Sequence, residues 1–448
     1  MKNTESVSLK VKLGYGSGEF ASSLLWITIA FWLMNFMTDE VGLSAGLAGL
    51  ALMVGKIWDA VTDPLVGFLS DRTKSRWGRR RPWFLFGAVP FGLTFLLMFT
   101  NFGLETQTAM FIWISLAFIL LCTAYTCCTV PYNALLPELS KDFNERSLIS
   151  GFKSIFAISA TIFGAGLAMP IIGSFSSRTS GFIAMGAVFG ALIIITTLIP
   201  FFTVKGSPAP EIKNQKNILK SNAEAFRNKP FVLLLVTWFF NTCGFTLLSA
   251  ILIYYFKYIY HDENLITLAS VIMLGTSMLF IPVAVKVASK IGKRNTYILG
   301  MSFLTATIIL LSLTGHLFGV TLVYVIIFFS GMGLSTHYVM PWSLIPDTVE
   351  YDYSLTGVRK EGVYYGLWTF SIKIAQAFAG LLLGIILSFH GYIPDVAQSS
   401  FSLFGIRMLI GPYPAVFFII GIIVLSFYPI NKKKYSEIQQ TIREMEKA

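Results

Sequence analysis

Apolar runs of about 20 residues follow one another along most of this chain, separated by short polar segments. Such a run is long enough to cross the hydrocarbon core of a bilayer as an α-helix. Within lipid, every backbone N–H and C=O group must find its partner inside the protein, so only helices and closed barrels can span. We therefore expect an all-α membrane protein.

Twelve apolar segments can be delimited, and an even number of crossings places both termini on the same side. A soluble chain of 448 residues would form about three domains, but 55% hydrophobic and only 13% charged residues favour the membrane interpretation. The predicted transmembrane helices lie at residues 15–38, 46–70, 82–101, 109–136, 150–174, 181–203, 231–257, 265–288, 295–314, 320–344, 362–388 and 407–430.

The net charge of +11 comes mostly from Lys and Arg in every second loop, whereas the alternate loops carry mostly acids. Because basic clusters beside transmembrane helices stay in the cytoplasm, both termini are predicted to be cytoplasmic. We expect a multi-pass protein of the cell membrane, inner or plasma. A nucleic-acid binder would instead show a basic face on a soluble domain, so nucleic acid is not an expected partner.

The longest polar interruption, residues 204–230, separates six predicted helices from the next six, and its Pro, Ser and Asn content is typical of a linker. We expect a six-helix bundle at 1–203, this cytoplasmic linker, a second six-helix bundle at 231–430 and a cytoplasmic tail at 431–448. Small residues followed by Gly and a basic cluster end both the second and the eighth segments. This weak internal repeat is typical of transporters.

Two carboxylates lie inside the second predicted helix. Asp59 and Asp63 are four residues apart and therefore share one face of the helix. A charge in hydrocarbon costs at least about 2.5–3.5 kcal/mol, and two acids one turn apart favour the uptake of positive charge. Thr62 and, from the fourth segment, Thr126 offer hydroxyl oxygens to a hard cation. We predict a site for Na⁺ or H⁺; the alternative is a structural ion pair with a lysine.

Lys373 lies near the middle of the eleventh segment, too deep to reach the interface easily. Its expected partners are Asp59 and Asp63, or the substrate, with a purely structural counter-ion as the alternative. Lys153, one turn into the fifth segment, faces either the cavity or the cytoplasm. Glu19 and Arg407 are expected at helix edges in contact with water.

The fourth segment carries Tyr125, Thr129 and Asn133, and amphipathic aromatic, hydroxyl and amide groups suit a polyhydroxylated ligand. In the second half, Trp342 belongs to a similar but weaker group. The alternative is ordinary polar contact between helices. The other members of that weaker group are His337, Tyr338 and Trp368.

Cytoplasmic loops of opposite charge suggest ion pairs that close an inner gate, although a solvated loop gives the same pattern. The acids of the loop after the tenth segment, Asp347, Glu350 and Asp352, would meet the basic loops of the first half. No catalytic motif occurs, so neither an enzyme nor a cofactor is expected. The candidate gate residues are Asp71, Arg72, Arg79, Arg146 and Asp347.

Several motifs taken together resemble one family of the major facilitator superfamily, the glycoside–pentoside–hexuronide:cation symporters, the group that contains melibiose permease. The resemblance spans the chain and implies two six-helix bundles that alternate access, with Na⁺ or H⁺ driving a substrate inward. The motifs are LGYGSGEF, WDAVTDPLVGFLSDRTKSRWGRRRPW, YTCCTVPYNALLPE with the following NER, IPDTVEYD and EGVYYGLWTFSIK.

The family's cation machinery is largely matched. Asp59 and Asp63 correspond to its paired cation-site aspartates, Thr126 to its threonine in the fourth helix, and Lys373 to its lysine in the eleventh. Its recognition residues are less well matched, because both sugar-binding acids are replaced. These departures lie at Ser23, Thr129 and Asn133, at Thr62 where an Asn is expected between the aspartates, and at Lys153 where an arginine is expected.

The leading hypothesis is a cation-coupled symporter for a sugar or glycoside that works as a monomer on a small-molecule substrate. A lysolipid or other amphiphile carrier of the same fold is the runner-up, because the sugar-binding acids are lost. A membrane scaffold or sensor is the third reading. Against this third hypothesis stand Asp59, Asp63 and Lys373, because a scaffold has no reason to keep such charges in hydrocarbon.

Overall fold

The structure is a computed structural model of the 448-residue chain that describes residues 7–139, 143–204, 224–357 and 361–445. Regular structure within these ranges is helical throughout, which confirms the all-α prediction. Eleven helices among the described residues are long and apolar enough to cross a membrane. The first predicted segment completes the set of twelve, because α1 (Leu9–Thr28) continues through two π-helical turns, η1 (Ile29–Leu33) and η2 (Phe36–Glu40).

The helices follow the predicted segments closely, with two interruptions. The fifth segment breaks at Leu167, and the twelfth breaks at Gly411, where Pro412 begins a new helix. The remaining elements are α2 (Ala45–Arg72), α3 (Arg81–Met98), α4 (Gln107–Asn133), α5 (Leu136–Leu139), α6 (Phe143–Gly166), α7 (Ala168–Gly173), α8 (Arg178–Thr203), α10 (Lys229–Ile259), α11 (Leu265–Ile291), α12 (Lys293–Thr314), α13 (Val320–Thr356), α14 (Glu361–Phe389), α15 (Ser400–Ile410), α16 (Pro412–Ser426) and α17 (Lys432–Met445).

The chain forms two compact units, and each contains most of one predicted bundle. The first unit adds two short segments from the second half of the chain to the first half, and the remainder forms the second unit. The first consists of Met1–Glu211, Asp262–Ser270 and Gly380–Ser399, and the second of Ile212–His261, Val271–Ala379 and Ser400–Ala448.

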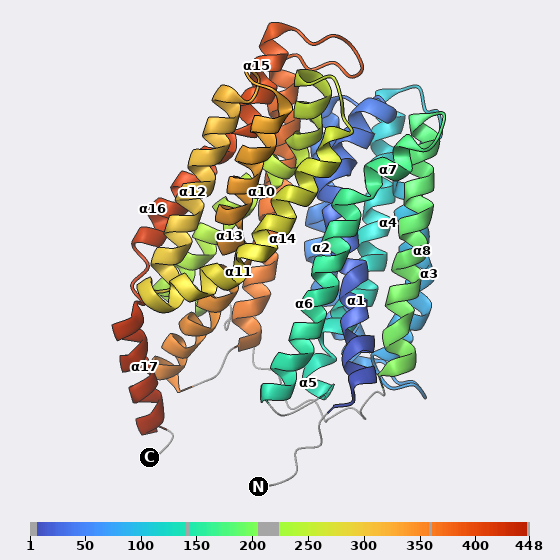
Figure 1. The fold of residues 1–448 in the computed structure, drawn as a ribbon. Coiled ribbons are helices and arrows are strands. Elements are labelled where there is room, and N and C mark those ends of the chain that lie inside the picture. Colours follow the sequence, from blue (N-terminus) through green and yellow to red (C-terminus); the bar gives the residue numbers. More distant parts are fainter. Residues whose placement is uncertain (1–6, 140–142, 205–223, 358–360, 446–448) are drawn as a thin grey trace. The chain divides into compact units, whose positions relative to one another are not determined.

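Each unit has its own helix packing, which can be followed in Figure 1. In the first unit, α1 packs against α6 and α8, α3 packs against α4 and α8, and α2 packs against α4. In the second unit, α12 packs against α13 and α16, and α10 packs against α16.

Three glycines near the start of α1 let three neighbouring helices approach it closely. A Cβ atom at Gly14 would lie 2.0 Å from the Thr203 side chain of α8, and one at Gly18 would lie 2.6 Å from the Tyr132 ring of α4. A Cβ at Gly16 would meet α6, 2.9 Å from the ring of Phe156 and 3.2 Å from the backbone of Phe152. The alternating glycines therefore bring α1, α4, α6 and α8 together around the residues described below.

At the other end of the first unit, Arg178 at the start of α8 joins three segments. Its guanidinium pairs with Glu40 of η2 at 3.0 Å and with Glu263 just before α11, and it donates to Asn35 Oδ1 at 2.8 Å. Nearby, the hydroxyl of Tyr392 donates to Asp39 at 2.6 Å. This group, called here the Arg178 network, ties residues 262–270 and 380–399 to the first half of the chain.

Helix α13 extends well beyond the predicted end of its segment at residue 344. It ends at Thr356, and the next residue, Gly357, has a φ of 66°, in the left-handed region that glycine adopts without strain. Asp347, Glu350 and Asp352 therefore lie on a helix, and their prediction as loop residues is wrong. Their charges indicated the end of the apolar run, but a helix can continue into water once its backbone bonds are made.

Candidate functional site

Thr126 of α4 lies between the two carboxylates of α2. Its hydroxyl oxygen is 2.9 Å from Asp59 Oδ1 and 3.2 Å from Asp63 Oδ1. Thr126 and Asp59 have no exposed surface, and Asp63 is half-buried. Three oxygen-bearing side chains from two helices thus form one polar centre in the first unit, and their role as cation ligands stays a prediction.

Close packing of α2 against α4 sets the position of Thr126 relative to the two carboxylates. Gly55, one turn before Asp59, lies against Phe118, and a Cβ atom there would come within 2.1 Å of that ring. On the same pair of helices, the indole nitrogen of Trp58 donates to the Thr123 hydroxyl at 2.8 Å. These contacts, which precede the carboxylates along α2, hold Thr126 opposite the face of that helix that carries both acids.

The chemistry of this centre suits a small hard cation. Carboxylate and hydroxyl oxygens are the ligands that such ions prefer, and two acids near one another favour an added positive charge. Clusters of three His, Cys, Asp or Glu side chains, as expected of a transition-metal site, do not occur in the described part of the chain. A monovalent cation or a proton fits the donor set better than a tightly held metal.

Thr62, the fourth predicted cation ligand, uses its hydroxyl hydrogen within its own helix. The hydroxyl lies 3.1 Å from the carbonyl of Trp58 and 3.2 Å from that of Asp59. Its lone pairs keep acceptor capacity, so a role as ligand stays a prediction. The backbone bond fixes the rotamer, which determines where that oxygen points.

Sequence reasoning missed Lys56, which lies one helical turn before Asp59 on α2. Its side chain is buried, with 4% of the residue exposed, and its ammonium lies 3.1 Å from the centroid of the Trp26 ring of α1. The ring of Trp26 in turn packs edge-to-face on Tyr125, with centroids 5.0 Å apart. The signal that singled out Lys373, a charge inside an apolar helix, applied equally to Lys56.

A second polar group in the first unit joins α1, α4 and α6. Lys153 donates to Asn133 Oδ1 at 2.7 Å and pairs with Glu19 at 3.1 Å. Lys153 and Asn133 were predicted to bind substrate, and the structure brings them together. Glu19, which we expected at a helix edge in contact with water, forms this ion pair and keeps 21% of its side chain exposed. Its charge in an apolar run was the available signal.

The other predicted substrate residues of the first unit lie on α1 and α4. The Thr129 hydroxyl donates to the Tyr125 carbonyl at 2.9 Å, so its hydrogen serves the helix. Tyr125 is half-buried between Trp26 and Phe91, and Ser23 is half-buried on α1. Their substrate roles stay predictions.

In the second unit, Lys373 is half-buried on α14. Its predicted partners, Asp59 and Asp63, belong to the first unit, so that pairing stays a prediction. Trp342 is 44% exposed, and its ring packs edge-to-face on Trp368 at 6.1 Å. Behind it, Trp368, Trp238 and His337 stack with successive centroid distances of 4.9 and 4.7 Å.

Of the candidate gate residues, Asp347 has the clearest contact. Lys293, at the start of α12, binds both of its carboxylate oxygens at 2.7 and 2.8 Å, within the second unit. Arg72 is exposed and Arg79 is half-buried in the segment after α2. The side chains of Asp71 and Arg146 lie outside the described residues, and the inner gate stays a prediction.

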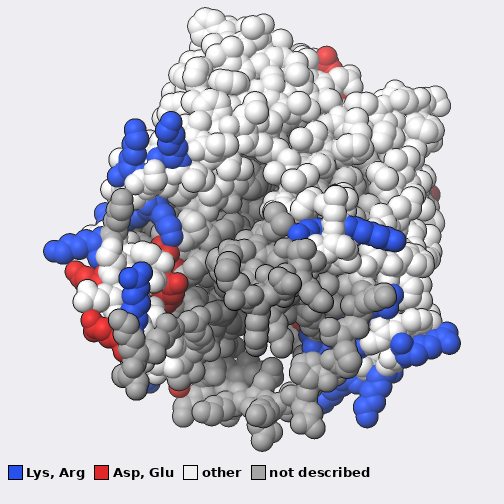
Figure 2. Space-filling view, turned by 60° about the horizontal axis from the view of Figure 1, so that its bottom comes forward, with Lys and Arg blue, Asp and Glu red and all other residues white. Residues whose placement is uncertain are grey.

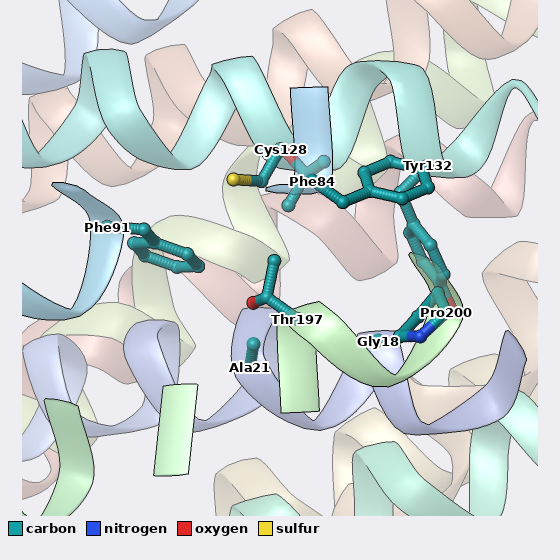
Figure 3. A pocket seen from close by; sticks show the side chains of 9 residues that line it. Gly18, Ala21, Phe84, Phe91, Cys128, Tyr132, Thr197 and Pro200 are labelled. Carbon is teal, nitrogen blue, oxygen red and sulfur yellow. The ribbon is translucent and has the colours of Figure 1, made fainter. Parts of the chain in front are cut away.

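A small cavity lies behind α4 in the first unit, among α1, α3, α4 and α8. Its volume of about 10 Å³ admits a single water molecule, far less than a sugar needs. Figure 3 shows the Thr197 side chain between Cys128 of α4 and Ala21 of α1. The cavity is therefore too small for a sugar in this structure.

Comparison with known proteins agrees with this architecture. A family model described as MFS/sugar transport protein matches residues 14–432. A putative sulfoquinovose importer of Escherichia coli is 30% identical over 98% of this chain and 95% of its own length. An isoprimeverose transporter of Lactiplantibacillus pentosus is 28% identical over 96% and 91%, respectively.

Among solved structures, a mutant of the nucleoside transporter NupG superposes with a TM-score of 0.69 at 14% identity, covering 92% of this chain and 99% of that one. This likeness shows the fold, and the family model and the relatives make the chain a multi-pass membrane transporter of the major facilitator type rather than an enzyme. More narrowly, the chain belongs to the MFS/sugar transport family, within the glycoside–pentoside–hexuronide:cation symporters.

Proposed function

We propose that this protein is a symporter that couples the entry of Na⁺ or H⁺ to the uptake of a sugar or glycoside by alternating access. The observation that carries the proposal is Thr126 within 3.2 Å of both Asp59 and Asp63, buried in a transporter of this family. The relatives named for sugars support the substrate class.

The charges within the first six predicted segments support one monovalent cation per cycle. These segments contain three acids, Glu19, Asp59 and Asp63, and two bases, Lys56 and Lys153. The set therefore carries one excess negative charge, which a single Na⁺ or H⁺ neutralises. Moving a neutralised set through the membrane costs less than moving a charged one, which is a physical basis for coupling.

Lys373 supplies the coupling in the second unit. A basic side chain there can respond to the charge that the cation brings, so substrate and cation favour the same rearrangement of the protein. In this scheme the protein works as a monomer and needs no cofactor beyond the coupling cation.

The distribution of basic residues supports an orientation with both termini in the cytoplasm. In the first unit, exposed Lys and Arg lie at the start of α1 and after α2. In the second, they lie at the end of α11 and on α17, and Figure 2 displays the face that carries such residues. Basic loops stay cytoplasmic, so the Arg178 network would lie on the outer side.

Uptake by proteoliposomes that contain the purified protein tests the proposal. Imposed sodium or proton gradients should drive accumulation of a labelled sugar, and Asp63→Cys should abolish accumulation while the protein remains in the membrane. Normal cation-stimulated uptake by that variant would refute the cation site. Movement of a lysolipid alone would show that the protein is an amphiphile carrier instead.

A further inference from the structure

The pair formed by Glu19 and Lys153 is the second centre of charge in the first unit, and the cation site does not use it. Its two members come from α1 and α6, and Asn133 of α4 completes the group through its 2.7 Å bond to Lys153. The side chains of Glu19 and Lys153 are 21% and 26% exposed. The group is thus partly enclosed by the protein and keeps exposed surface that a ligand can contact.

Aromatic packing fixes the geometry of this group. Tyr132, the neighbour of Asn133, stacks on Tyr15 with ring centroids 4.6 Å apart and donates its hydroxyl to the Tyr15 carbonyl at 2.8 Å. Gly18, next to Glu19, leaves the space that the Tyr132 ring occupies. Lys153 lies 5.5 Å from the same ring. This packing sets the backbone positions from which the carboxylate, the ammonium and the amide meet.

The group keeps hydrogen-bonding capacity for a ligand. A carboxylate has two oxygens, an ammonium three hydrogens, and an amide two N–H groups. The contacts described above use one oxygen of Glu19, two hydrogens of Lys153 and the carbonyl of Asn133. An acceptor on Glu19 and donors on Lys153 and Asn133 remain, which is the complement of adjacent hydroxyl groups.

The charge of the group is already balanced, and this selects among ligands. A carboxylate or sulfonate placed here would lie beside Glu19 and share Lys153 with it, so like-charge repulsion would oppose its binding. A neutral polyol meets no such repulsion. Hydrogen bonds to charged groups are also about twice as strong as neutral ones, so the ion pair favours hydroxyl ligands.

We propose that Glu19, Lys153 and Asn133 form the part of the substrate site that binds neutral hydroxylated sugars and rejects acidic ones. This inference rests on the proposed function and adds the charge class of the substrate. Glu19 is its specificity-determining residue. Replacing Glu19 by a neutral amide would free Lys153 for an anion, and the preference should then reverse.

The test compares uptake of isoprimeverose, a neutral sugar, with uptake of sulfoquinovose, which carries a sulfonate. Calorimetry of sugar binding to the purified protein gives a second readout. The wild type should prefer the neutral sugar. In E19Q that preference should fall by about tenfold or more, since a charged hydrogen bond is lost, and the acidic sugar should gain. E19D should retain part of the neutral preference.

The matched control is E105Q, because Glu105 is an exposed acid outside this group. Equal preferences in E19Q, E105Q and the wild type would overturn the inference, and so would a wild type that favours sulfoquinovose. In both cases sugar transport would still stand. A wild type that neither moves nor binds any sugar would instead refute the proposed function, and this inference with it. Gel filtration of each variant excludes loss through misfolding.

Discussion

The ammonium of Lys56 lies 3.1 Å from the centroid of the Trp26 ring, one helical turn before the buried carboxylate of Asp59. An aromatic face stabilises a desolvated cation, so the Trp26 ring offsets part of the cost of burying the Lys56 ammonium. We expect the positive charge of this lysine, one turn from Asp59, to weaken the attraction of the paired aspartates for a coupling ion.

Removing that charge should tighten cation binding and impair coupling. Lys56→Met keeps the apolar stem but leaves the acids of the site less compensated, so the apparent affinity for Na⁺ or H⁺ should rise by about tenfold. Cation titration of the purified protein measures the affinity, with Lys290→Met, at an exposed position, as control. A lowered affinity would contradict this role for Lys56.

The Thr126 hydroxyl should matter more than the volume of its side chain. Thr126→Val is nearly isosteric but removes the oxygen, and we expect cation-stimulated uptake to fall by about tenfold or more, because buried acids lose a hydrogen-bond donor. Thr126→Ser should retain most activity. Thr161→Val, whose lost hydroxyl only contacts its own helix, is the control. Equal effects of the Val and Ser variants would argue against a ligand role.

Loss of the lysine on α14 should separate transport from the cation gradient. In Lys373→Ala, the positive charge on α14 is gone, so substrate should equilibrate without accumulating when a sodium or proton gradient is imposed. Counterflow assays detect such equilibration independently of accumulation. If cation dependence is unchanged, Lys373 has a structural role.

Adding one methyl group at Gly18 should destabilise the first unit. The new Cβ would lie 2.6 Å from the ring of Tyr132, and overpacking of this kind costs about 1–3 kcal/mol. Thermal unfolding of Gly18→Ala should therefore begin at lower temperature. Gly151→Ala on α6 is the matched control, because its Cβ meets no atom within 4 Å and alanine favours the helix.

The stability that the Arg178 network contributes should depend on pH once the guanidinium of Arg178 is removed. Burial raises the pKa of the Glu40 carboxyl, and Arg178 opposes that rise. In Arg178→Gln the pKa of Glu40 should rise further, so the folded protein holds its proton more tightly than the unfolded chain does. The stability lost relative to wild type should then be larger near pH 8 than near pH 5, because deprotonation of the buried acid is what costs free energy. Denaturation at both pH values measures it, and a loss independent of pH would assign Arg178 a packing role.

Hydropathy was sufficient to predict the positions of the helices. A bilayer requires a long apolar run in each spanning helix, whichever helices it packs against. Hydropathy could not indicate the break at Gly411 or the extension of α13, since both depend on backbone geometry at single residues. Helical periodicity likewise placed Asp59 and Asp63 on one face, and the resemblance paired them with Thr126.

The partners of the remaining charges depended on packing between helices that lie far apart in sequence. Glu19 and Lys153 are separated by more than a hundred residues, and their pairing follows from the close approach of α1 and α6. Lys56 was visible as an intramembrane charge, but its contact with Trp26 was not. Composition and spacing carry no information on such contacts.

The glycines of α1 also determine how this helix can move. Successive helical residues turn by about 100°, so Gly14 and Gly18 point to nearly the same side and Gly16 to the opposite one. With α4 and α8 pressed against one side and α6 against the other, α1 cannot rotate about its axis without a clash. The contacts at Gly14, Gly16 and Gly18 therefore fix the rotational setting of α1, and with it the side of the helix from which Glu19 meets Lys153.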